Sequence, residues 1–247
     1  MSGKRFTFTV DGVVVEASAG QTILQACDAA GVYIPRLCYH PDLEPAGHCR
    51  VCTCSVNGRF SSACTMPASP GMVVESDTPG LNGDRRTIIE MLFAEGNHFC
   101  PACEKSGDCE LQALGYRLGM EALPFANLWP RRDIDASHPD IVLERNRCVL
   151  CTRCVRASRM LDGKSVFGLE GRGVHLRLNV DAACLGETAM SAADKAAAVC
   201  PVGCILIKDH GYRTPYGRRR FDDKPIGADI EAKRLPRKQS GGDHGEA

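Results

Sequence analysis

The sequence predicts an α+β protein made of small domains in series. Apolar and polar residues alternate near the N-terminus, which is typical of paired strands. Segments with helical periodicity follow, and the cysteines gather in three groups between these predicted elements. The chain has 247 residues, which is enough for one large domain or for two to three small ones.

The first predicted domain covers residues 1–80. Residues 5–17 predict a hairpin, because alternating apolar and polar residues flank Asp11-Gly12, a favoured two-residue turn. Residues 21–30 predict a short helix with one apolar face. Two later segments have strand-like composition, at residues 51–56 and 72–74. A hairpin, a helix and then a cysteine-rich loop predict a β-grasp sheet.

The second predicted domain, residues 81–123, is small and helical. Asp84 can cap its first helix, and a second helix is predicted at about residues 110–118. Residues 124–140 contain three prolines and the only tryptophan. This composition predicts a linker that is packed on its neighbours.

The third predicted domain, residues 141–210, has cysteines at both ends. Between them, residues 174–180 are strand-like and residues 189–199 predict an alanine-rich helix. The remaining residues, 211–247, are charged and poor in apolar side chains. Such composition favours a solvated, partly disordered tail. The alternative is a docking arm that becomes ordered on a partner.

Composition argues against several classes of function. Lys+Arg and Asp+Glu number 30 each, so the formal net charge is zero and a general affinity for nucleic acid or an anionic membrane is not expected. No stretch approaches the roughly 18 apolar residues of a membrane span. Residues 1–10 lack the apolar core of a signal peptide. We therefore expect a cytoplasmic protein with no nucleic-acid or membrane partner.

The cysteine content points to bound metal. There are 15 cysteines, an odd number, in a chain with no visible export signal. Cytoplasmic thiols stay reduced, which makes a disulfide framework improbable. An excess of cysteine in a reducing compartment is more often bound to metal.

The first cysteine group follows the pattern C-x10-C-x2-C-x11-C. Its members are Cys38, Cys49, Cys52 and Cys64. Four thiolates in one loop suit a [2Fe–2S] cluster, because each iron takes two sulfurs from the protein. Gly47 would let the backbone come close to the cluster. A zinc site is the alternative. Cys54 could compete as a ligand, although a fifth cysteine more often packs as a small apolar side chain.

The second group combines three cysteines with a nearby histidine. Its members are His98, Cys100, Cys103 and Cys109. Three cysteines leave one iron of a [4Fe–4S] cluster without a protein ligand, and His98 is the candidate for it. A neutral imidazole in place of a thiolate should raise the reduction potential. The alternative is a loop histidine with no ligand role.

The third group has the pattern C-x2-C-x2-C, followed after 45 residues by Cys-Pro. Its members are Cys148, Cys151, Cys154 and Cys200. Bacterial ferredoxins use this pattern for one [4Fe–4S] cluster. Four cysteines are left over, namely Cys27, Cys54, Cys184 and Cys204. We expect Cys27 and Cys204 to be core residues. No nucleophile elbow, HExxH motif or dinucleotide fingerprint is present, so no catalytic centre is visible.

Four stretches carry a family resemblance over about residues 5–207. They read LCYHPDL, GHCRVC, CPACEKSGDCELQ and CVLCTRCVR. In this order they resemble the N-terminal region of the large iron–sulfur subunit of respiratory complex I. That region has a β-grasp [2Fe–2S] domain, a [4Fe–4S] domain with one histidine and three cysteine ligands, and a ferredoxin-like [4Fe–4S] domain. The family's usual histidine lies four residues before its first cysteine, where this chain has Gly96.

A short chain of this kind is most similar to the diaphorase small subunits of bidirectional NAD-reducing [NiFe]-hydrogenases. The resemblance implies an electron-transfer subunit that has no catalytic centre and carries one [2Fe–2S] and two [4Fe–4S] clusters. Its partners would be a flavin- and NAD-binding diaphorase large subunit and the hydrogenase small and large subunits. Three alternatives remain open: a subunit of another NAD-linked oxidoreductase such as a formate dehydrogenase, a free ferredoxin-like carrier, and a structural zinc protein.

Overall fold

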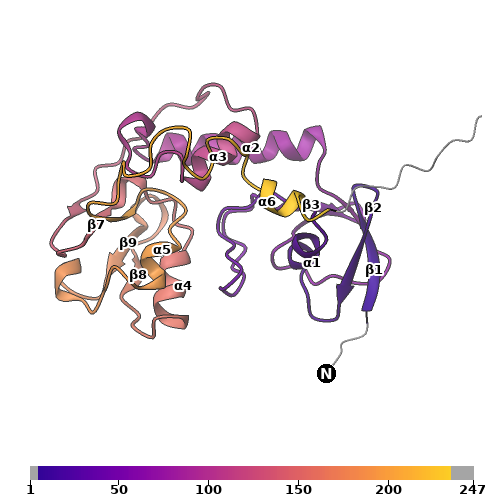
Figure 1. Ribbon diagram of the computed structural model, residues 1–247, viewed down its shortest axis with the longest axis horizontal. Helices are drawn as coiled ribbons and strands as arrows, with labels where there is room; N and C mark the ends of the chain where they lie inside the picture. Colours follow the sequence, from indigo (N-terminus) through magenta and orange to yellow (C-terminus); the bar gives the residue numbers. More distant parts are fainter. Residues whose placement is uncertain (1–4, 235–247) are drawn as a thin grey trace, which may run out of the picture.

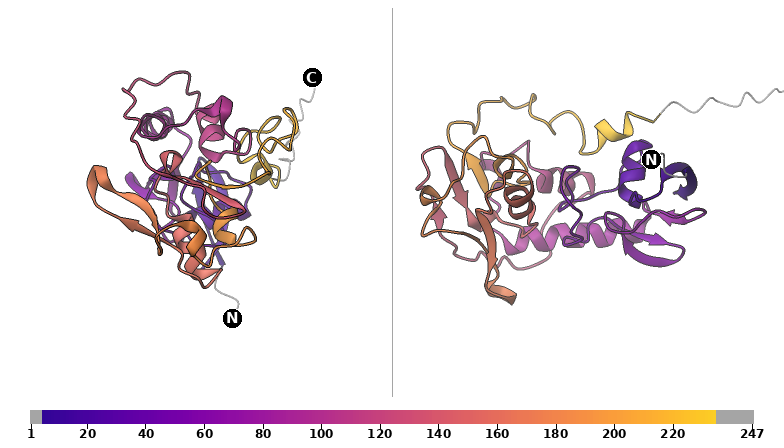
Figure 2. Two further views of the ribbon diagram at one scale, coloured as in Figure 1. Left: turned by 90° about the vertical axis from the view of Figure 1, so that its left-hand side faces the viewer. Right: turned by 90° about the horizontal axis from the view of Figure 1, so that it is seen from below.

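The computed structural model describes residues 5–234, which fold as a mixed α/β chain. A β-sheet domain occupies one end of the molecule, and a lobe occupies the other (Figure 1). The lobe contains α4 (Arg153–Met160), β7 (Ile141–Glu144), β8 (Phe167–Glu170) and β9 (Arg177–Val180). The long helix α2, Pro79–Glu95, runs lengthwise between these two parts (Figure 2). No helix in the described range is long and apolar enough to cross a membrane.

The N-terminal domain is a five-stranded sheet with the order β2-β1-β5-β3-β4. Its strands are β1 (Arg5–Val10), β2 (Val13–Ser18), β3 (Thr53–Val56), β4 (Arg59–Ser62) and β5 (Val73–Glu75). β1 and β5 are parallel, and the other pairs are antiparallel. Asp11 and Gly12 have φ of 48° and 75°, as a type I′ turn requires, so the predicted hairpin is confirmed.

The predicted helix after this hairpin is also confirmed, as α1, Ile23–Ala29. Thr22 and Gln25 form a capping box at its start: the Gln25 backbone N–H donates to Thr22 Oγ1, and the Thr22 N–H donates to Gln25 Oε1. Strand β4 was not expected from the sequence. It follows Asn57-Gly58, a second type I′ turn with φ of 49° and 79°.

The helical segment starts earlier than the sequence analysis expected. The side chain of Thr78, and not that of Asp84, caps α2 by accepting from the Leu81 N–H at 3.2 Å, and Pro79 takes the first helical position. Asp84 lies inside the helix. The short 3-10 helix η1 (Cys100–Ala102) follows, and then α3, Glu110–Arg117, confirms the second predicted helix.

The lobe at the other end contains two small sheets and short helices. One sheet has the order β10-β7-β6, and β8 and β9 form the other. The elements are β6 (Ile134–Asp135), β7 (Ile141–Glu144), η2 (Arg145–Arg147), α4 (Arg153–Met160), β8 (Phe167–Glu170), η3 (Gly173–His175), β9 (Arg177–Val180), η4 (Leu185–Glu187), α5 (Lys195–Ala198) and β10 (Ile205–Ile207).

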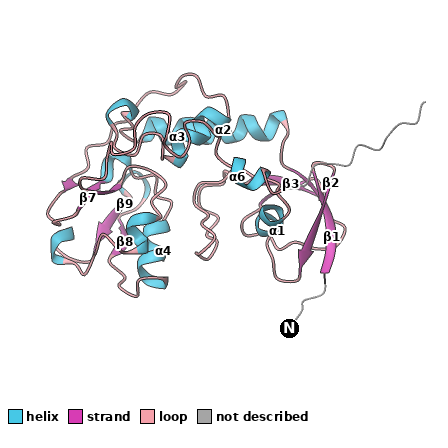
Figure 3. Ribbon diagram, viewed as in Figure 1, coloured by secondary structure: helices cyan, strands magenta, loops and turns pink. Residues whose placement is uncertain are grey.

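Two predictions for this lobe were only partly right. The strand expected at 174–180 is confined to β9, because η3 takes up its first residues. The alanine-rich helix expected at 189–199 is reduced to the four residues of α5. The Asp194 carboxylate accepts the Ser191 backbone N–H, which holds the preceding residues in a turn instead of a helix. Figure 3 shows how much of the lobe is loop.

Two clusters of buried side chains form the core. One fills the β-sheet domain, between the sheet and α1. The other fills the lobe and includes α2, α3 and α4 residues. Leu37, Leu43 and Val51 come from the N-terminal cysteine loop but belong to the second cluster. Apolar packing therefore joins the first cysteine group to the lobe.

The segment 124–140 was expected to pack on its neighbours, and this was only partly correct. Leu128 and Trp129 are 71% and 62% exposed. The segment is nevertheless attached, because the Leu128 N–H donates to the Ala94 carbonyl at 2.9 Å and β6 pairs with β7. His138 is buried and contacts the Met190 carbonyl through Nε2.

Residues 211–234 are mostly exposed, as expected for a solvated tail, but the expected partial disorder is wrong for them; residues 235–247 lie outside the described part. The segment crosses from the lobe to the β-sheet domain and ends beside α1 (Figure 2). The Phe221 N–H donates to the Gly107 carbonyl at 2.9 Å, and Arg117 donates to the Ile226 carbonyl at 2.7 Å. The short helix α6, Ala228–Glu231, follows. Low apolar content made this attachment hard to predict, because hydrogen bonds and an ion pair between Arg117 and Glu231 supply much of it.

Replacing Gly227 by alanine should detach α6. Gly227 has φ of +94°, and an added Cβ would fall within the Tyr33 ring, 2.5 Å from Cδ1. We expect residues 226–232 to exchange amide hydrogens roughly tenfold faster, for a cost of about 1.4 kcal/mol. Gly217→Ala is the control, since Gly217 has φ of +82° but open space around it. Equal exchange in the two variants would contradict the proposed packing.

Candidate cluster-binding sites

The side chains of the first cysteine group come together beside α1, β3 and the loop that leads into β3. The Cys38 N–H donates to Cys49 Sγ at 3.3 Å, and the Cys49 N–H donates to Cys38 Sγ at 3.5 Å. The Cys64 thiol contacts both Cys38 and Cys52. Hydrogen bonds from the Cys49 and Cys64 thiols lower the pKa of Cys38 to about 2. The structure thus brings all four predicted members together.

Gly47 and Arg50 give this loop its sharp turns, with φ of 68° and 61°. The fifth cysteine, Cys54, faces a different environment. It is fully buried, its thiol accepts from Arg85 Nη2 at 3.9 Å, and burial raises its pKa to about 11. Arg85 is itself buried and donates to the carbonyls of Val51 and Thr53. Cys54 therefore packs as the sequence analysis expected, as does Cys27 in the same core.

The second group surrounds η1 and the start of α3. Cys100, Cys103 and Cys109 influence one another electrostatically, and burial raises the pKa of Cys109 to about 12. Arg147 is close enough to affect the pKa of both Cys100 and His98. Its guanidinium also forms an ion pair with Glu104 at 2.8 Å. Arg147 thus lies beside both the thiols and the imidazole.

His98 has the character of a ligand. Its Nε2 is buried and has no hydrogen-bond partner among the described residues. Burial, and secondarily Arg147, lowers the pKa of His98 to about 4, so the ring is neutral at pH 7. A neutral imidazole with a free nitrogen is the form that binds metal. The Phe93 ring packs against it edge-on at 5.3 Å.

Gly96 explains how a histidine two residues later in the chain can serve this site. A Cβ on Gly96 would overlap the His98 ring at Nε2 and lie 2.7 Å from its Cδ2. The imidazole therefore occupies the space into which a side chain at position 96 would project. By resemblance, the complex I pattern has its histidine at position 96, and in this chain the His98 ring fills the space beside that position.

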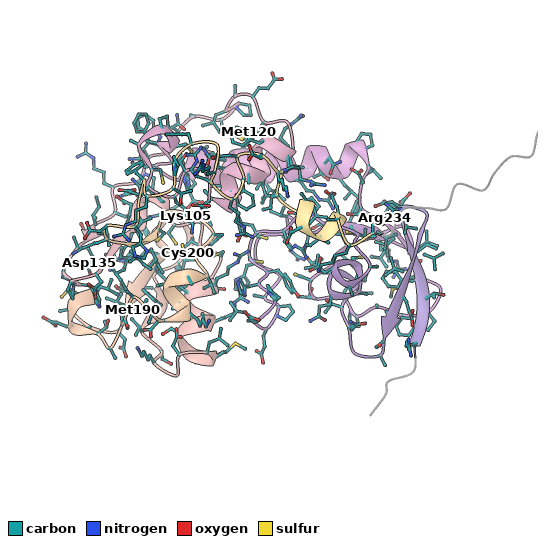
Figure 4. The ribbon with its side chains drawn as sticks, in the orientation of Figure 1. Lys105, Met120, Asp135, Met190, Cys200 and Arg234 are labelled. Atoms are coloured by element: carbon teal, nitrogen blue, oxygen red, sulfur yellow. The ribbon has the colours of Figure 1, made fainter. Side chains whose placement is uncertain are left out.

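The third group lies between η2, α4 and the loop after α5. Leu150 and Thr152 adopt left-handed backbone conformations, with φ of 52° and 59°, and fold the first three cysteines around one hollow. The Leu150 N–H donates to Cys148 Sγ at 3.4 Å. All four predicted members line this hollow, namely Cys148, Cys151, Cys154 and Cys200. Figure 4 labels Cys200.

Cys204 is a site residue that the sequence analysis did not recognise. It is buried in the core as expected, but it also lines the same hollow. Its thiol contacts those of Cys148 and Cys200 and lowers the pKa of Cys200 to about 6. The Cys-Pro-x-x-Cys spacing was the available signal. Cys184, by contrast, lies at the start of η4, outside the three groups.

The third group lies between the other two, although it is last in the sequence. On one side, Arg156 Nη2 donates to the carbonyls of Cys38 at 2.6 Å and Cys151 at 3.3 Å. Thr152 Oγ1 also contacts His48 Nδ1 at 3.1 Å. These bonds attach the third group to the first.

On the other side, the 200–204 loop contacts the second group. A Cβ on Gly203 would lie 2.7 Å from Cys103 Sγ, so only glycine allows this approach. The Glu110 N–H donates to the Pro201 carbonyl at 2.8 Å. The spatial order of the groups is therefore first, third, second.

Family models match three consecutive regions of the chain. Residues 3–79 match a 2Fe-2S iron-sulfur cluster binding domain, and residues 85–123 match the NADH-ubiquinone oxidoreductase-G iron-sulfur binding region. Residues 141–207 match a 4Fe-4S single cluster domain. The NAD-reducing hydrogenase HoxS subunit gamma of Cupriavidus necator is 42% identical over 221 residues, which cover 89% of this chain and 94% of that protein. This chain belongs to the HoxS gamma-subunit family.

Other relatives place the family more widely. A chain in a crystal structure of NAD+-reducing [NiFe]-hydrogenase in the H2-reduced state superposes with a TM-score of 0.88 and 50% identity, covering 93% of this chain and 99% of that one. The mitochondrial 78 kDa subunit of NADH-ubiquinone oxidoreductase from Neurospora crassa is 34% identical over 83% of this chain, which spans 28% of that protein. The resemblance inferred from the motifs is confirmed. Within residues 5–234, no group of three or more His, Cys, Asp or Glu side chains is arranged to hold a single metal ion.

Proposed function

We propose that this chain is the electron-transfer subunit of an NAD-reducing hydrogenase. It would relay electrons between a hydrogenase module, made of a small and a large subunit, and a flavin- and NAD-binding diaphorase subunit. The observation that carries this proposal is the arrangement of three donor groups in one series, in a chain whose family members include a hydrogenase subunit. The chain contributes no catalytic centre of its own.

The donor sets fit three clusters. The first group would hold a [2Fe–2S] cluster, because each of its four thiols contacts at least one other. Its members are Cys38, Cys49, Cys52 and Cys64. His98, Cys100, Cys103 and Cys109 would hold a [4Fe–4S] cluster, and the unpartnered His98 nitrogen supports this. Cys148, Cys151, Cys154 and Cys200 would hold the other [4Fe–4S] cluster, in a ferredoxin-like site. When bound, the clusters supply one-electron redox chemistry.

The protein itself would set the distances between the clusters and tune their reduction potentials. Burial of most of the thiols limits their contact with water. Backbone N–H groups that point at sulfur, such as that of Leu150 at Cys148, stabilise negative charge there. Arg156 and the Gly203 turn fix the separation of neighbouring sites. Electrons would pass along the spatial order, through the third group.

Deleting the chain from the assembled enzyme tests this function. We expect hydrogen-dependent NAD+ reduction to be lost while hydrogen-dependent reduction of a viologen dye persists, because the dye can take electrons from the hydrogenase module directly. Wild-type chain added in trans should restore the first activity. Loss of formate-dependent NAD+ reduction instead would favour a formate dehydrogenase subunit. Release of the chain from its complex by high salt would favour a free carrier.

A further inference from the structure

We propose that Cys204 is a reserve ligand of the third site, able to replace Cys200 or Cys148. This inference rests on the proposed function, because it assumes that the site holds a [4Fe–4S] cluster. Such a cluster needs four protein ligands, and this site offers five thiols. Cys204 is 1% exposed, and its thiol lies within hydrogen-bonding reach of both Cys148 and Cys200.

The backbone makes the exchange geometrically simple. Cys200 and Cys204 lie at the two ends of one tight loop whose turn is Gly203. β10 begins at Ile205 and pairs with β7, which holds Cys204 in register beside the hollow. A thiol at either end of the loop can therefore reach the same side of the site. In the exchange, the bond from iron to Cys204 sulfur replaces the missing bond to Cys200, and the Cys204 thiol proton goes to solvent.

The first cysteine group provides a natural comparison. It also has an extra cysteine, Cys54, only two residues from Cys52. The Cys54 thiol contacts Arg85 and Ser76, whereas those of Cys38, Cys49, Cys52 and Cys64 contact one another. Cys54 is therefore nearer in sequence to a proposed ligand than Cys204 is, but its thiol does not contact the thiols of its group. Cys54 should be unable to replace a lost ligand.

The experiment counts iron and records EPR spectra for single and double variants of the full chain, purified anaerobically. Wild-type chain, Cys204→Ala and Cys200→Ala should each keep about ten irons, and Cys200→Ala/Cys204→Ala should keep about six. The rescued centre in Cys200→Ala should show altered g-values, since one ligand has moved. Cys151→Ala, with no spare thiol beside it, should lose its centre, and Cys52→Ala should lose the [2Fe–2S] signal.

The outcomes separate the two proposals. A wild-type chain without the third centre would contradict the proposed function. A wild-type chain with three centres, combined with Cys200→Ala that loses four irons but keeps its [2Fe–2S] signal, would overturn the reserve-ligand inference. The [2Fe–2S] signal thus reports folding in the same sample. If Cys200→Ala misfolds, Cys148→Ala decides by the same criterion, because Cys204 also contacts that thiol.

Discussion

Replacing His98 by alanine is expected to remove about four of about ten irons, leaving the other two centres in place. The His98 Nε2 atom is buried and has no hydrogen-bond partner among residues 5–234, and the pKa of about 4 keeps the ring neutral and ready to bind iron. Its removal leaves only three thiols for a [4Fe–4S] cluster. Iron analysis with EPR of the reduced chain measures the loss. His98→Cys should retain the irons and lower the reduction potential of that centre, because a thiolate replaces a neutral ligand.

Gly96→Ala should cause the same loss of iron, although it replaces no proposed ligand residue. The added methyl group would overlap the imidazole, and Gly96 has an ordinary φ of −94°, so its cost comes from that overlap alone. Gly83→Ala, inside the helix that Gly96 ends and with nothing within 4 Å of an added Cβ, is the control and should keep all irons. If both the His98→Ala and Gly96→Ala chains retain a full complement of iron, the histidine is not a ligand.

Arg156→Met is expected to release the first cysteine loop from α4. The Arg156 guanidinium donates to the carbonyls of Glu44 at 2.5 Å and Cys38 at 2.6 Å, and the methionine would fill the volume without donating. Leaving the buried Cys38 carbonyl and the partly buried Glu44 carbonyl unpaired should cost about 3 kcal/mol. Amide exchange in residues 37–51 should then become about a hundredfold faster.

Arg159→Met is the control for this change, since Arg159 is on the same helix but exposed. Its exchange rates should match those of the wild-type chain. Unchanged exchange in Arg156→Met would mean that apolar packing of Leu37, Leu43 and Val51 alone holds the loop. We also expect slower electron transfer from the first to the third site in Arg156→Met, because the two sites are no longer held at a fixed separation.

Local signals in the sequence predicted local structure well. Asp11-Gly12 identified the first hairpin, and the same reasoning applied to Asn57-Gly58 would have identified β4. Asp84 was the wrong helix cap because Thr78 followed by Pro79 is a stronger start signal six residues earlier. The cysteine spacings brought together the members of each group that the structure also brings together, but they missed Cys204 in the third group.

The spatial order of the groups could not be predicted from these signals. It depends on hydrogen bonds between residues more than a hundred positions apart, such as Arg156 to Cys38. Two buried arginines on α4 were visible inside the CVLCTRCVR motif, but nothing local says which carbonyls they bind. The attachment of residues 211–234 was missed for the same reason. The need for glycine at position 96 could not be predicted either, because nothing local shows that the His98 ring lies beside it.

We propose that this chain holds three iron–sulfur clusters in series. The most direct test is the iron and acid-labile sulfide content of the anaerobically purified full chain, with EPR of the dithionite-reduced sample. We expect about ten irons per chain, with the signals of one [2Fe–2S] and two [4Fe–4S] centres. Zinc in place of iron, or a colourless chain with no EPR signal, would contradict it.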